Sequence, residues 1–382
     1  MDSKLTNLRS TPLKGLGWDH PRGLDALKRA DARLQEETGL TVEWVARSLQ
    51  EFSEQTPAEL YAGFDLISID HPHVPHAVEY GQLIALDLHA PDDVARLARE
   101  SVGPSHASYH YQGHQWGLAT DAAAQVSAFR PDLVDCAPLL WDDVFERATG
   151  KTVLWPYKPV DAICTLLSLC AQLRHPAGAV GEQFSLDAIE HALEILQRLT
   201  SLVPDWCAQA NPIDVAEALT GDDQFTTGVA MFGYSNYSRR GFRQARLVYQ
   251  DIPSFDGRSR GAVLGGAGLA VSARTERVED AVTAAVFLSS ASCQSDEYLV
   301  GGGQPGNIYA WKSHRVNVAT EHFFANTLRT LEKSWVRPHS PGWPDAQRDA
   351  SRILHEALVA RTSDRRLAQE LQTILESGVM RP

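Results

Sequence analysis

Aromatic and polar side chains gather just after two apolar segments near the N-terminus. Trp18, His20 and Arg22 follow the run Leu13–Gly17. Asp70, His71 and His73 lie at the end of the run that starts at Phe64. An indole ring can stack on the flat face of a sugar or an aromatic solute. Histidine and carboxylate groups donate or accept hydrogen bonds, and a guanidinium fork fits a carboxylate. These six residues are therefore candidates for binding a small polar solute.

Each of these residues also has a purely structural interpretation. Trp18 fits a core position with His20 in an ordinary loop, and Arg22 fits a solvated position at a helix start. The histidines near residue 70 fit helix-capping or structural roles. The residue types alone leave both interpretations open.

The same loops contain the nitrogen and oxygen ligands that zinc prefers, because Asp19 and His76 lie close to the six candidates. The segment has neither a helical HxxxH spacing nor a cysteine partner. We therefore expect no metal and no cofactor. The alternative left open is that the histidine-rich loop binds an anion or a metal.

A second group of candidates lies further along the chain. The carboxylate of Asp121 can accept two hydroxyl hydrogen bonds, which suits a sugar or polyol, or it can stabilise a hinge. Tyr234, Ser235 and Asn236 follow an apolar strand-like run and offer a ring, a hydroxyl and an amide. The neighbouring basic residues are expected to be mostly exposed to solvent: Arg239, Arg240 and Arg243.

Two glycine clusters mark places where the backbone bends or comes close to another group. In the run Leu264–Ser272, Gly266 and Ala267 would allow the backbone to approach a ligand. In the cluster Gly301–Asn307, the side chains of Gln304 and Asn307 can donate and accept hydrogen bonds. Tight packing or ordinary turns would explain both clusters equally well.

The sequence gives little support for catalysis. Tyr234-Ser235-Asn236 lacks the second glycine of a nucleophile elbow, and His355-Glu356 is not followed by a histidine at metalloprotease spacing. There is neither a GxGxxG pattern nor a P-loop lysine. We therefore expect that the protein is not an enzyme. The enzymatic alternative would use Asp70 with His71 or His73 as an acid–base pair.

The bulk composition narrows the class of protein. With 382 residues the chain is long enough for two or three domains. Its net charge of -13 argues against nucleic acid or an anionic membrane as a partner. The five cysteines show no CxxC spacing, so buried thiols are expected. Met1–Asn7 shows no secretory signal and no run could span a bilayer, so either a signal was removed or the protein stays in the cytoplasm.

Hydrophobic periodicity predicts alternating strands and helices. The first 70 residues are expected to form a βαβαβ unit with a parallel sheet. Its elements are strands over Leu13–Gly17, Leu40–Ala46 and Phe64–Asp70 and helices over Gly23–Thr38 and Pro57–Tyr61. A hairpin is expected over His110–Leu118. Further strands are expected over Ala124–Phe129, Gly228–Phe232 and Arg246–Tyr249, and helices over Trp141–Ala148, Asp161–Leu173, Leu186–Leu202, Val278–Ser290 and Asp345–Glu376.

Several motifs, in this order, resemble those of family 1 extracellular solute-binding proteins of ABC importers. The segment Tyr111–Leu118 resembles the family's hairpin, with Ala119 where proline is usual, and Asp121–Arg130 resembles the crossing that follows. The other matching segments are Leu140–Asp143, Thr226–Met231, Leu264–Ser272, Gly301–Pro305 and Pro338–Pro344. The family's basic residue after the second glycine cluster is displaced to Lys312. The polar N-terminal loops depart from the family pattern.

This resemblance implies an α/β, two-lobed periplasmic-binding-protein-like fold of type II, with a central sheet flanked by helices in each lobe and a ligand cleft between the lobes. It places residues 1–119 and 266–316 in the N-terminal lobe and residues 120–265 and 317–382 in the C-terminal lobe. Crossings are expected near 120, 265 and 316. One bank of the cleft would carry Trp18, His20 and Asp70, and the other would carry Tyr234 to Asn236.

The resemblance also implies a function. A periplasmic, monomeric binding protein would capture a sugar, polyol or small carboxylate and deliver it to the permease subunits of an ABC transporter, without inserting into the membrane. The alternative is a cytoplasmic small-molecule sensor on the same fold.

Overall fold

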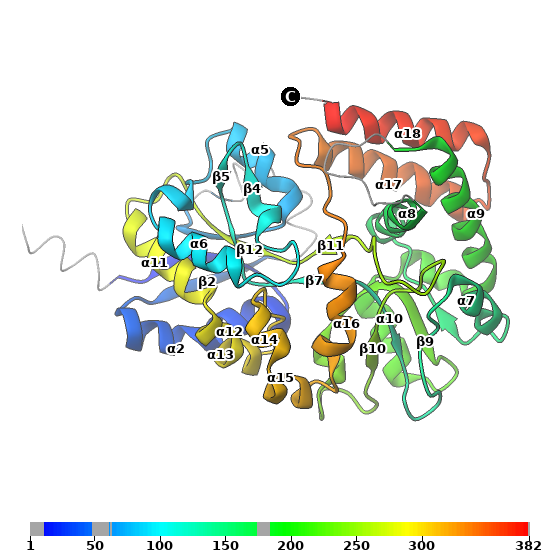
Figure 1. The fold of residues 1–382 in the computed structure, drawn as a ribbon, viewed down its shortest axis with the longest axis horizontal. Coiled ribbons are helices and arrows are strands. Elements are labelled where there is room, and N and C mark those ends of the chain that lie inside the picture. Colours follow the sequence, from blue (N-terminus) through cyan, green and yellow to red (C-terminus); the bar gives the residue numbers. More distant parts are fainter. Residues whose placement is uncertain (1–10, 48–60, 62, 174–183, 381–382) are drawn as a thin grey trace, which may run out of the picture. The chain divides into compact units, whose positions relative to one another are not determined.

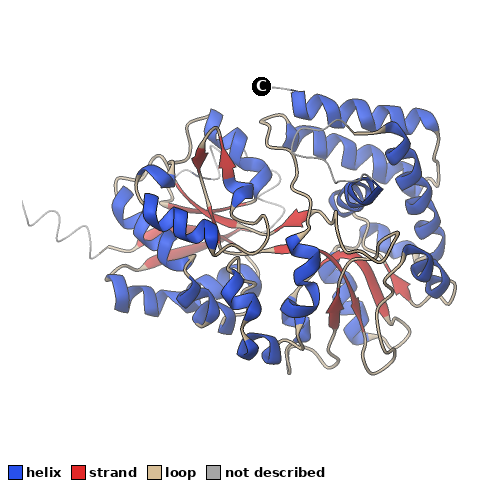
Figure 2. Ribbon diagram, in the orientation of Figure 1, coloured by secondary structure: helices blue, strands red, loops and turns tan. Residues whose placement is uncertain are grey.

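The protein is represented by a computed structural model that describes residues 11–47, 61, 63–173 and 184–380 (Figures 1 and 2). The chain forms two compact units. Unit 1 comprises Met1–Ala122 and Gly266–Val316, and unit 2 comprises Ala123–Gly265 and Asn317–Pro382. The chain therefore passes from one unit to the other three times, after residues 122, 265 and 316.

Unit 1 contains a five-stranded mixed sheet with the order β2-β1-β3-β12-β6. Its strands are β1 (Leu13–Trp18), β2 (Val42–Arg47), β3 (Leu66–Ile69), β6 (Leu118–Ala119) and β12 (Gly268–Val271). β1 pairs in parallel with β2 and β3, which confirms the predicted parallel arrangement. β12 runs antiparallel to both β3 and β6. The carboxyl ends of β1, β3 and β6 therefore lie at one edge of the sheet, beside the start of β12.

Both faces of this sheet are buried. Alternate residues point to opposite faces, so Leu66 packs in one core cluster and the next residue, Ile67, in the other. Helices α2 (Ala26–Thr38) and α11 (Val278–Leu288) cover the first face through residues such as Leu34. The short helix α5 (Val74–Glu79) packs against the second face. Burial on both faces explains why these strands are continuous apolar runs.

Helix α2 begins later than predicted, because a π-helical turn over Pro21–Asp25 precedes it. It ends at Gly39 in the left-handed conformation, as predicted. The predicted hairpin is present as β4 (His110–Tyr111) and β5 (His114–Gln115), with Gly113 in its turn. Among the described residues, the remaining α-helices that begin in unit 1 are α6 (Pro91–Arg99), α12 (Ala291–Ser295), α13 (Glu297–Val300), α14 (Ile308–Lys312) and α15 (His314–Ala319). Of the helix predicted over Pro57–Tyr61, only Tyr61 lies within the described residues.

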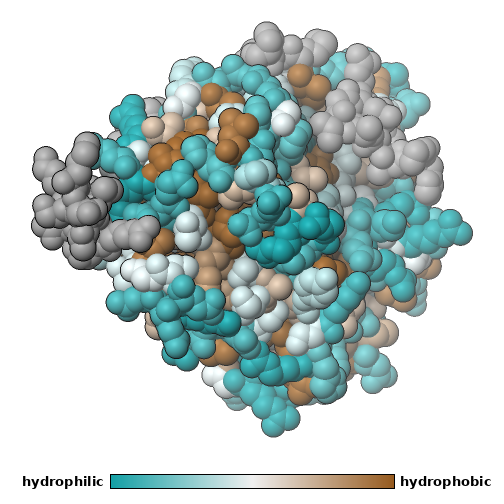
Figure 3. All heavy atoms as spheres, turned by 60° about the vertical axis from the view of Figure 1, so that its left-hand side comes forward, coloured by the Kyte–Doolittle hydropathy of each residue, from teal (hydrophilic) through white to brown (hydrophobic). Residues whose placement is uncertain are grey.

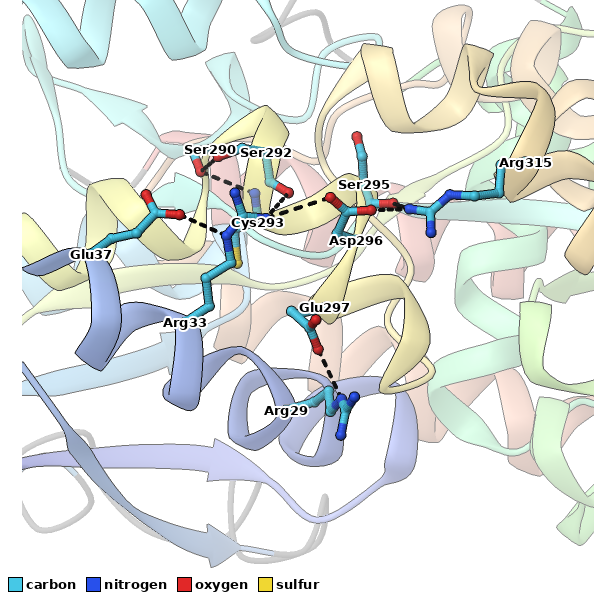
Figure 4. A network of polar contacts seen from close by, with 10 residues as sticks. All are labelled: Arg29, Arg33, Glu37, Ser290, Ser292, Cys293, Ser295, Asp296, Glu297 and Arg315. Carbon is cyan, nitrogen blue, oxygen red and sulfur yellow. Dashed lines mark hydrogen bonds and ion pairs between the residues drawn. The ribbon is translucent and has the colours of Figure 1, made fainter.

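A surface network of charges joins α2 to the segment that contains α12 and α13 (Figure 4). Arg29 donates to Glu297 over 2.9 Å, and Arg33 donates to Glu37 and to the carbonyl of Ser292. Asp296 lies between Arg33 and Arg315 and forms an ion pair with each. The thiol of Cys293 is buried beneath this network, and burial raises its pKa to about 12. The network holds the outer helices of unit 1 together.

Unit 2 contains a second sheet with the order β10-β7-β9-β8, and β11 also pairs with β7. Its strands are β7 (Ala123–Phe129), β8 (Val153–Leu154), β9 (Thr227–Phe232), β10 (Val248–Gln250) and β11 (Leu264–Gly265). The ladder between β7 and β9 is irregular next to Val126. Across from it, Ala230 has a positive φ of 47°, which is uncommon for a residue with a side chain. This irregularity bends β9 shortly before the predicted site residues Tyr234 to Asn236.

The α-helices in the described part of unit 2 are α7 (Trp141–Ala148), α8 (Pro159–Leu173), α9 (Leu186–Leu202), α10 (Pro212–Gly221), α16 (Phe323–Glu332), α17 (Trp343–Val359) and α18 (Arg365–Met380). The prediction of one helical stretch over Asp345–Glu376 was wrong, because a short non-helical segment separates α17 from α18. Arg361 adopts a left-handed conformation there, and the carboxylate of Asp364 accepts a hydrogen bond from the backbone of Leu367. This capping bond starts a new helix.

Four cysteines are buried, Cys164, Cys170, Cys207 and Cys293, whereas Cys136 is exposed, contrary to the prediction. Within the described ranges, none of the helices combines the length and the apolar character needed to span a bilayer. Hydrophilic side chains predominate on the face in Figure 3, with apolar residues in smaller areas between them. This mixture is typical of protein surfaces in contact with water.

Candidate functional site

One edge of the unit 1 sheet brings together residues from distant parts of the chain. Trp18 ends β1, Asp70 follows β3, and Asp121 follows β6 by two residues. Gly268, at the start of β12, pairs with Ile69 on one side and with Ala119 on the other. Ligand sites in open α/β sheets form at the carboxyl ends of strands. This edge is therefore the candidate site of unit 1.

Arg22 and Asp121 form a buried ion pair at this edge. The Nε and Nη2 atoms of Arg22 donate to the two carboxylate oxygens of Asp121 over 2.7 and 2.5 Å. The side chains are only 4% and 5% exposed. Burial raises the pKa of Asp121, and the positive charge of Arg22 opposes that rise. Both residues were predicted to contact a ligand, and the structure shows that they bind each other.

Trp18 and His20 form a stacked pair beside this ion pair. Their ring centroids are 4.7 Å apart and the rings are within 10° of parallel. The Nδ1 atom of His20 accepts a hydrogen bond from the backbone N–H of Arg22 over 3.1 Å. Burial, followed by the nearby charge of Arg22, lowers the pKa of His20 to about 4. The imidazole is therefore neutral near pH 7.

The residues after β3 divide into an accessible carboxylate and a buried histidine. The side chain of Asp70 is 40% exposed, and its Oδ1 lies 3.2 Å from Nδ1 of His71. His71 is buried, with its ring edge-on to Tyr109 at a centroid distance of 6.2 Å. His73 is half-buried and lies in the same short turn. Asp70 is thus available to solvent, whereas the His71 ring belongs to the interior of unit 1.

Gly266 and Ala267 hold the chain segment that leaves β6. The backbones of Ala267 and Asp121 exchange two hydrogen bonds, of 2.9 and 3.1 Å. Gly266 has a φ of 117°, and a Cβ atom there would collide with the backbone oxygen of Asp121. A glycine is therefore required where these two segments pass each other.

Gln304 and Asn307 have structural roles in unit 1. The Gln304 side chain is buried and donates to the carbonyl of Ala122 over 2.9 Å. Asn307 caps helix α14 by accepting from the backbone of Tyr309, and its amide donates to Glu100. These contacts fit the turn-amide alternative, and the predicted ligand contact of these two residues stays a prediction.

Tyr298 is a member of this cluster that sequence reasoning missed. It is buried, and its hydroxyl is hydrogen-bonded to Thr120, next to Asp121. Burial raises the pKa of Tyr298 well above its usual value, and the negative charge of Asp121 raises it further. Tyr298 lies in the four-residue helix α13, which is too short to show hydrophobic periodicity.

In unit 2, Tyr234, Ser235 and Asn236 are all buried where β9 ends. The Oδ1 atom of Asn236 is buried and accepts no hydrogen bond from the described residues. A buried acceptor of this kind is stabilised by a donor from water or a bound molecule. Arg240 and Arg243 are exposed, as predicted, whereas Arg239 is half-buried.

A buried polar network in unit 2 was also missed by sequence reasoning. Gln125 on β7 donates to Thr165 and accepts from Ser168, both on α8. The indole N–H of Trp155 donates to the same Thr165 hydroxyl, and the Trp155 ring stacks on Tyr157 at 4.9 Å. Burial raises the pKa of Asp161, in the first turn of α8, to about 8. Aromatic and polar groups are thus fixed where β8 leads into α8.

A metal site is not supported by the geometry. Among the residues that the structure describes, no group of three or more His, Cys, Asp or Glu side chains is placed to hold an ion. The histidines of the N-terminal loops point to different partners, since His20 accepts from a backbone N–H and His71 packs against Tyr109.

Comparison with known proteins identifies the fold. No protein-family model matches the sequence, and no curated protein matches it. Solved structures match over nearly the whole chain. Maltose-bound MalE3 of T. maritima has a TM-score of 0.79 and 16% identity, with 96% of this chain and 99% of that chain covered.

Two further structures give the same result. An ABC transporter solute-binding protein of Agrobacterium radiobacter K84 in complex with ribitol has a TM-score of 0.80 and 16% identity, covering 96% and 98% of the two chains. UgpB of Mycobacterium tuberculosis in complex with glycerophosphocholine has a TM-score of 0.77 and 15% identity, covering 97% and 98%. The chain thus has the two-lobed α/β fold of ABC transporter solute-binding proteins, as the sequence motifs predicted.

Proposed function

We propose that this protein is the substrate-binding protein of an ABC importer and captures a small polar solute such as a sugar, a polyol or a small carboxylate. The similar structures are binding proteins that hold maltose, ribitol or glycerophosphocholine. By the same similarity, we propose that it works as a monomer outside the cytoplasmic membrane and delivers the solute to permease subunits.

The observation that carries this proposal is the gathering of Trp18, His20 and Asp70 at the carboxyl edge of the unit 1 sheet within this fold. The aromatic pair supplies a flat apolar surface, and Asp70 supplies accessible acceptor oxygens. Alternating apolar faces and hydroxyl groups are the chemistry of sugars and polyols, which such a surface complements.

Other groups would complete the site. We propose that Asn236 of unit 2, which was predicted to bind the solute together with Tyr234 and Ser235, accepts a hydrogen bond from it through Oδ1. This oxygen is buried and accepts no hydrogen bond from the described residues. We also propose that units 1 and 2 are the two lobes and that the connecting segments near residues 120, 265 and 316 act as hinges.

The proposal is tested by thermal-shift screening and isothermal titration against sugars, polyols and small carboxylates. A solute at 100 times its Kd should stabilise the protein by about 2.7 kcal/mol. Trp18→Ala should weaken binding at least tenfold. Trp206→Ala, at an exposed position in unit 2, is the matched control and should bind like the wild type. Absence of binding across all three solute classes, or equal affinity of the two variants, contradicts the proposal.

A cytoplasmic sensor on the same fold is the second candidate. It is favoured by the five cysteines, which are all thiols in the structure, because thiols persist best in reducing compartments. Fractionation of cells that express the native gene separates the two candidates. A pool outside the cytoplasm supports the importer, and a wholly cytoplasmic pool supports the sensor.

A further inference from the structure

We propose that unit 2 carries a second small-molecule site, in a surface groove between α7 and α9, which binds a flat apolar acid with a single negative charge, such as an arylacetate. The groove has a volume of about 310 Å³, and the described residues that line it come from 140–145, 191–198 and Phe255, all within unit 2. Ligand pockets have volumes of roughly 300–1,000 Å³. The inference does not rest on the proposed function, because the groove shares no residue with the candidate site of unit 1.

The apolar walls of the groove are held in place by packing and hydrogen bonds. Helices α7 and α9 pack against each other, and Phe145 lines the groove from α7 (Figure 1). The loop that carries Phe255 is fixed to the start of α7, because the carbonyl of Ser254 accepts from the backbone N–H of Trp141 over 3.2 Å. The indole N–H of Trp141 in turn donates to Gln172 over 2.9 Å. Phe255 remains 37% exposed, so the walls offer an apolar surface to a flat ring.

The guanidinium of Arg198 is the group in the groove that favours an acid. Its Cζ lies 3.9 Å from the centroid of the Phe145 ring, within the range of a cation–π contact. The side chain is exposed, and among the described residues it donates no hydrogen bond and forms no ion pair. Glu194, one helical turn earlier, lies 3.7 Å from His191 instead. An arginine stacked on a ring keeps the N–H donors at its edge, which fit a carboxylate.

Two carboxylates limit the charge that the groove accepts. Asp142 and Glu194 line it together with Arg198, and both are exposed. A molecule with one negative charge can present that charge to the guanidinium. A second negative charge would lie near these carboxylates, and the repulsion between like charges excludes such a molecule. The groove should therefore prefer a monocarboxylate to a neutral ring and to a dicarboxylate.

The test compares three probes that share one ring: phenylacetate, its neutral amide phenylacetamide, and the dianion phenylmalonate. The full chain is labelled at the isoleucine methyl groups, and the signal of Ile195, which lines the groove, is assigned from its loss in Ile195→Val. We expect phenylacetate to shift this signal to saturation. Phenylacetamide, which lacks the charge, should bind about tenfold more weakly. Phenylmalonate should also bind more weakly than phenylacetate.

Two variants assign these differences to residues. Arg198→Gln should weaken the binding of phenylacetate about tenfold and leave that of phenylacetamide unchanged. Arg366→Gln is the matched control, since Arg366 is exposed on α18 and lies outside the groove, and it should change neither affinity. Glu194→Gln should bring the affinity for phenylmalonate closer to that for phenylacetate.

Three results would overturn the inference. They are an Ile195 signal that phenylacetate does not shift, equal affinities for phenylacetate and phenylacetamide, and an unchanged affinity for phenylacetate in Arg198→Gln. Trp18→Ala separates this site from that of the proposed function. A shift of Ile195 that persists in Trp18→Ala supports a second site on unit 2, whereas a shift that Trp18→Ala abolishes contradicts it.

The two proposals therefore fail separately. If none of the sugars, polyols and small carboxylates binds at the unit 1 edge and phenylacetate still shifts Ile195 through Arg198, only the proposed function fails. If a solute binds in a manner that depends on Trp18 and Ile195 does not respond to phenylacetate, only the second site fails.

Discussion

Arg22 and Arg130 are buried to the same extent, and their carboxylate partners differ in exposure. Arg22 in unit 1 meets Asp121, which is as deeply buried as the arginine itself. Arg130 in unit 2 binds Asp132 with the same two-point geometry, over 2.8 and 2.7 Å, and also binds Asp223. These two carboxylates are 56% and 81% exposed.

The difference in exposure reverses the effect on the carboxyl group. Hydrogen bonds from Arg130 lower the pKa of Asp132, whereas burial raises the pKa of Asp121 despite its bond to Arg22. A guanidinium–carboxylate bond therefore forms easily in unit 2, where the carboxylate stays in contact with water. In unit 1 the same kind of bond carries the free-energy cost of removing the carboxylate from water. A costly contact at the edge where the candidate ligand residues gather is consistent with a role in binding.

The largest expected effect comes from breaking the buried pair. Arg22→Met leaves Asp121 buried without a cation and should lower the free energy of unfolding by about 3–5 kcal/mol. Asp132→Asn should cost less than about 1 kcal/mol, because Arg130 retains Asp223 and water. Urea denaturation of both variants measures these losses. Equal losses would remove the distinction between the two arginines.

The next largest loss of stability is expected when the backbone of Asp121 is displaced while both residues of the Arg22–Asp121 ion pair are kept. Gly266→Ala places a Cβ against the backbone of Asp121 at a positive φ and should cost about 3 kcal/mol. Gly241→Ala is the control, since its φ is also positive and no atom lies within 4 Å of the added Cβ. The control should cost only about 1 kcal/mol. The same denaturation assay checks this prediction, which fails if the two variants are equally destabilised.

Acid should weaken the protein through His20. Its pKa is about 4 in the folded chain and 6.5 when unperturbed, so the unfolded state binds more protons between these values. Stability is therefore lost as the pH falls from 6.5 towards 4. With solvent screening, His20 should contribute on the order of 1 kcal/mol of the loss between pH 7 and pH 5.

His20→Gln should reduce the loss measured by denaturation at these two pH values. His106, whose pKa burial also lowers to about 4, should account for part of the loss that remains. An unchanged loss in His20→Gln would show that His20 is already able to bind a proton in the folded chain.

The smallest loss of stability is expected when one ion pair is removed from the charge network of Figure 4. Arg29 and Glu297 are partly exposed and their bond is screened by salt. Arg29→Ala should cost less than about 1 kcal/mol, and this cost should vanish at 1 M salt. A larger loss that persists in salt would mean that surface pairs of unit 1 behave like its buried pair.

Much of the fold was predictable from hydrophobic periodicity. The limits of α7 and α9 were predicted to the residue, and β1 differs by one residue. These elements bury one stripe or both faces, so their apolar residues repeat at a regular interval. Helices such as α13 and α14 are only four and five residues long and carry no such repeat. They were missed for that reason.

The position of the candidate site residues in the fold was predictable in part. Trp18, His20 and Asp70 were predicted to lie at the ends of strands, and the structure places them there, because strand ends can be recognised from the local sequence. The bond between Arg22 and Asp121 joins residues 99 positions apart, and no local pattern records such a pairing. The sequence therefore revealed which residues lie at the edge and left undetermined which of them bind each other.

Of the five cysteines, which all lie among the described residues, Cys136 has the one exposed thiol and is therefore a suitable position for attaching an optical reporter. Cys136 lies on unit 2, and burial raises the pKa of Cys207 and Cys293 to about 12, which keeps these two thiols protonated and slow to react. A maleimide dye should therefore couple at Cys136 without any cysteine being removed. The domain motion that we propose to accompany solute binding could then be followed by fluorescence in the unmutated protein.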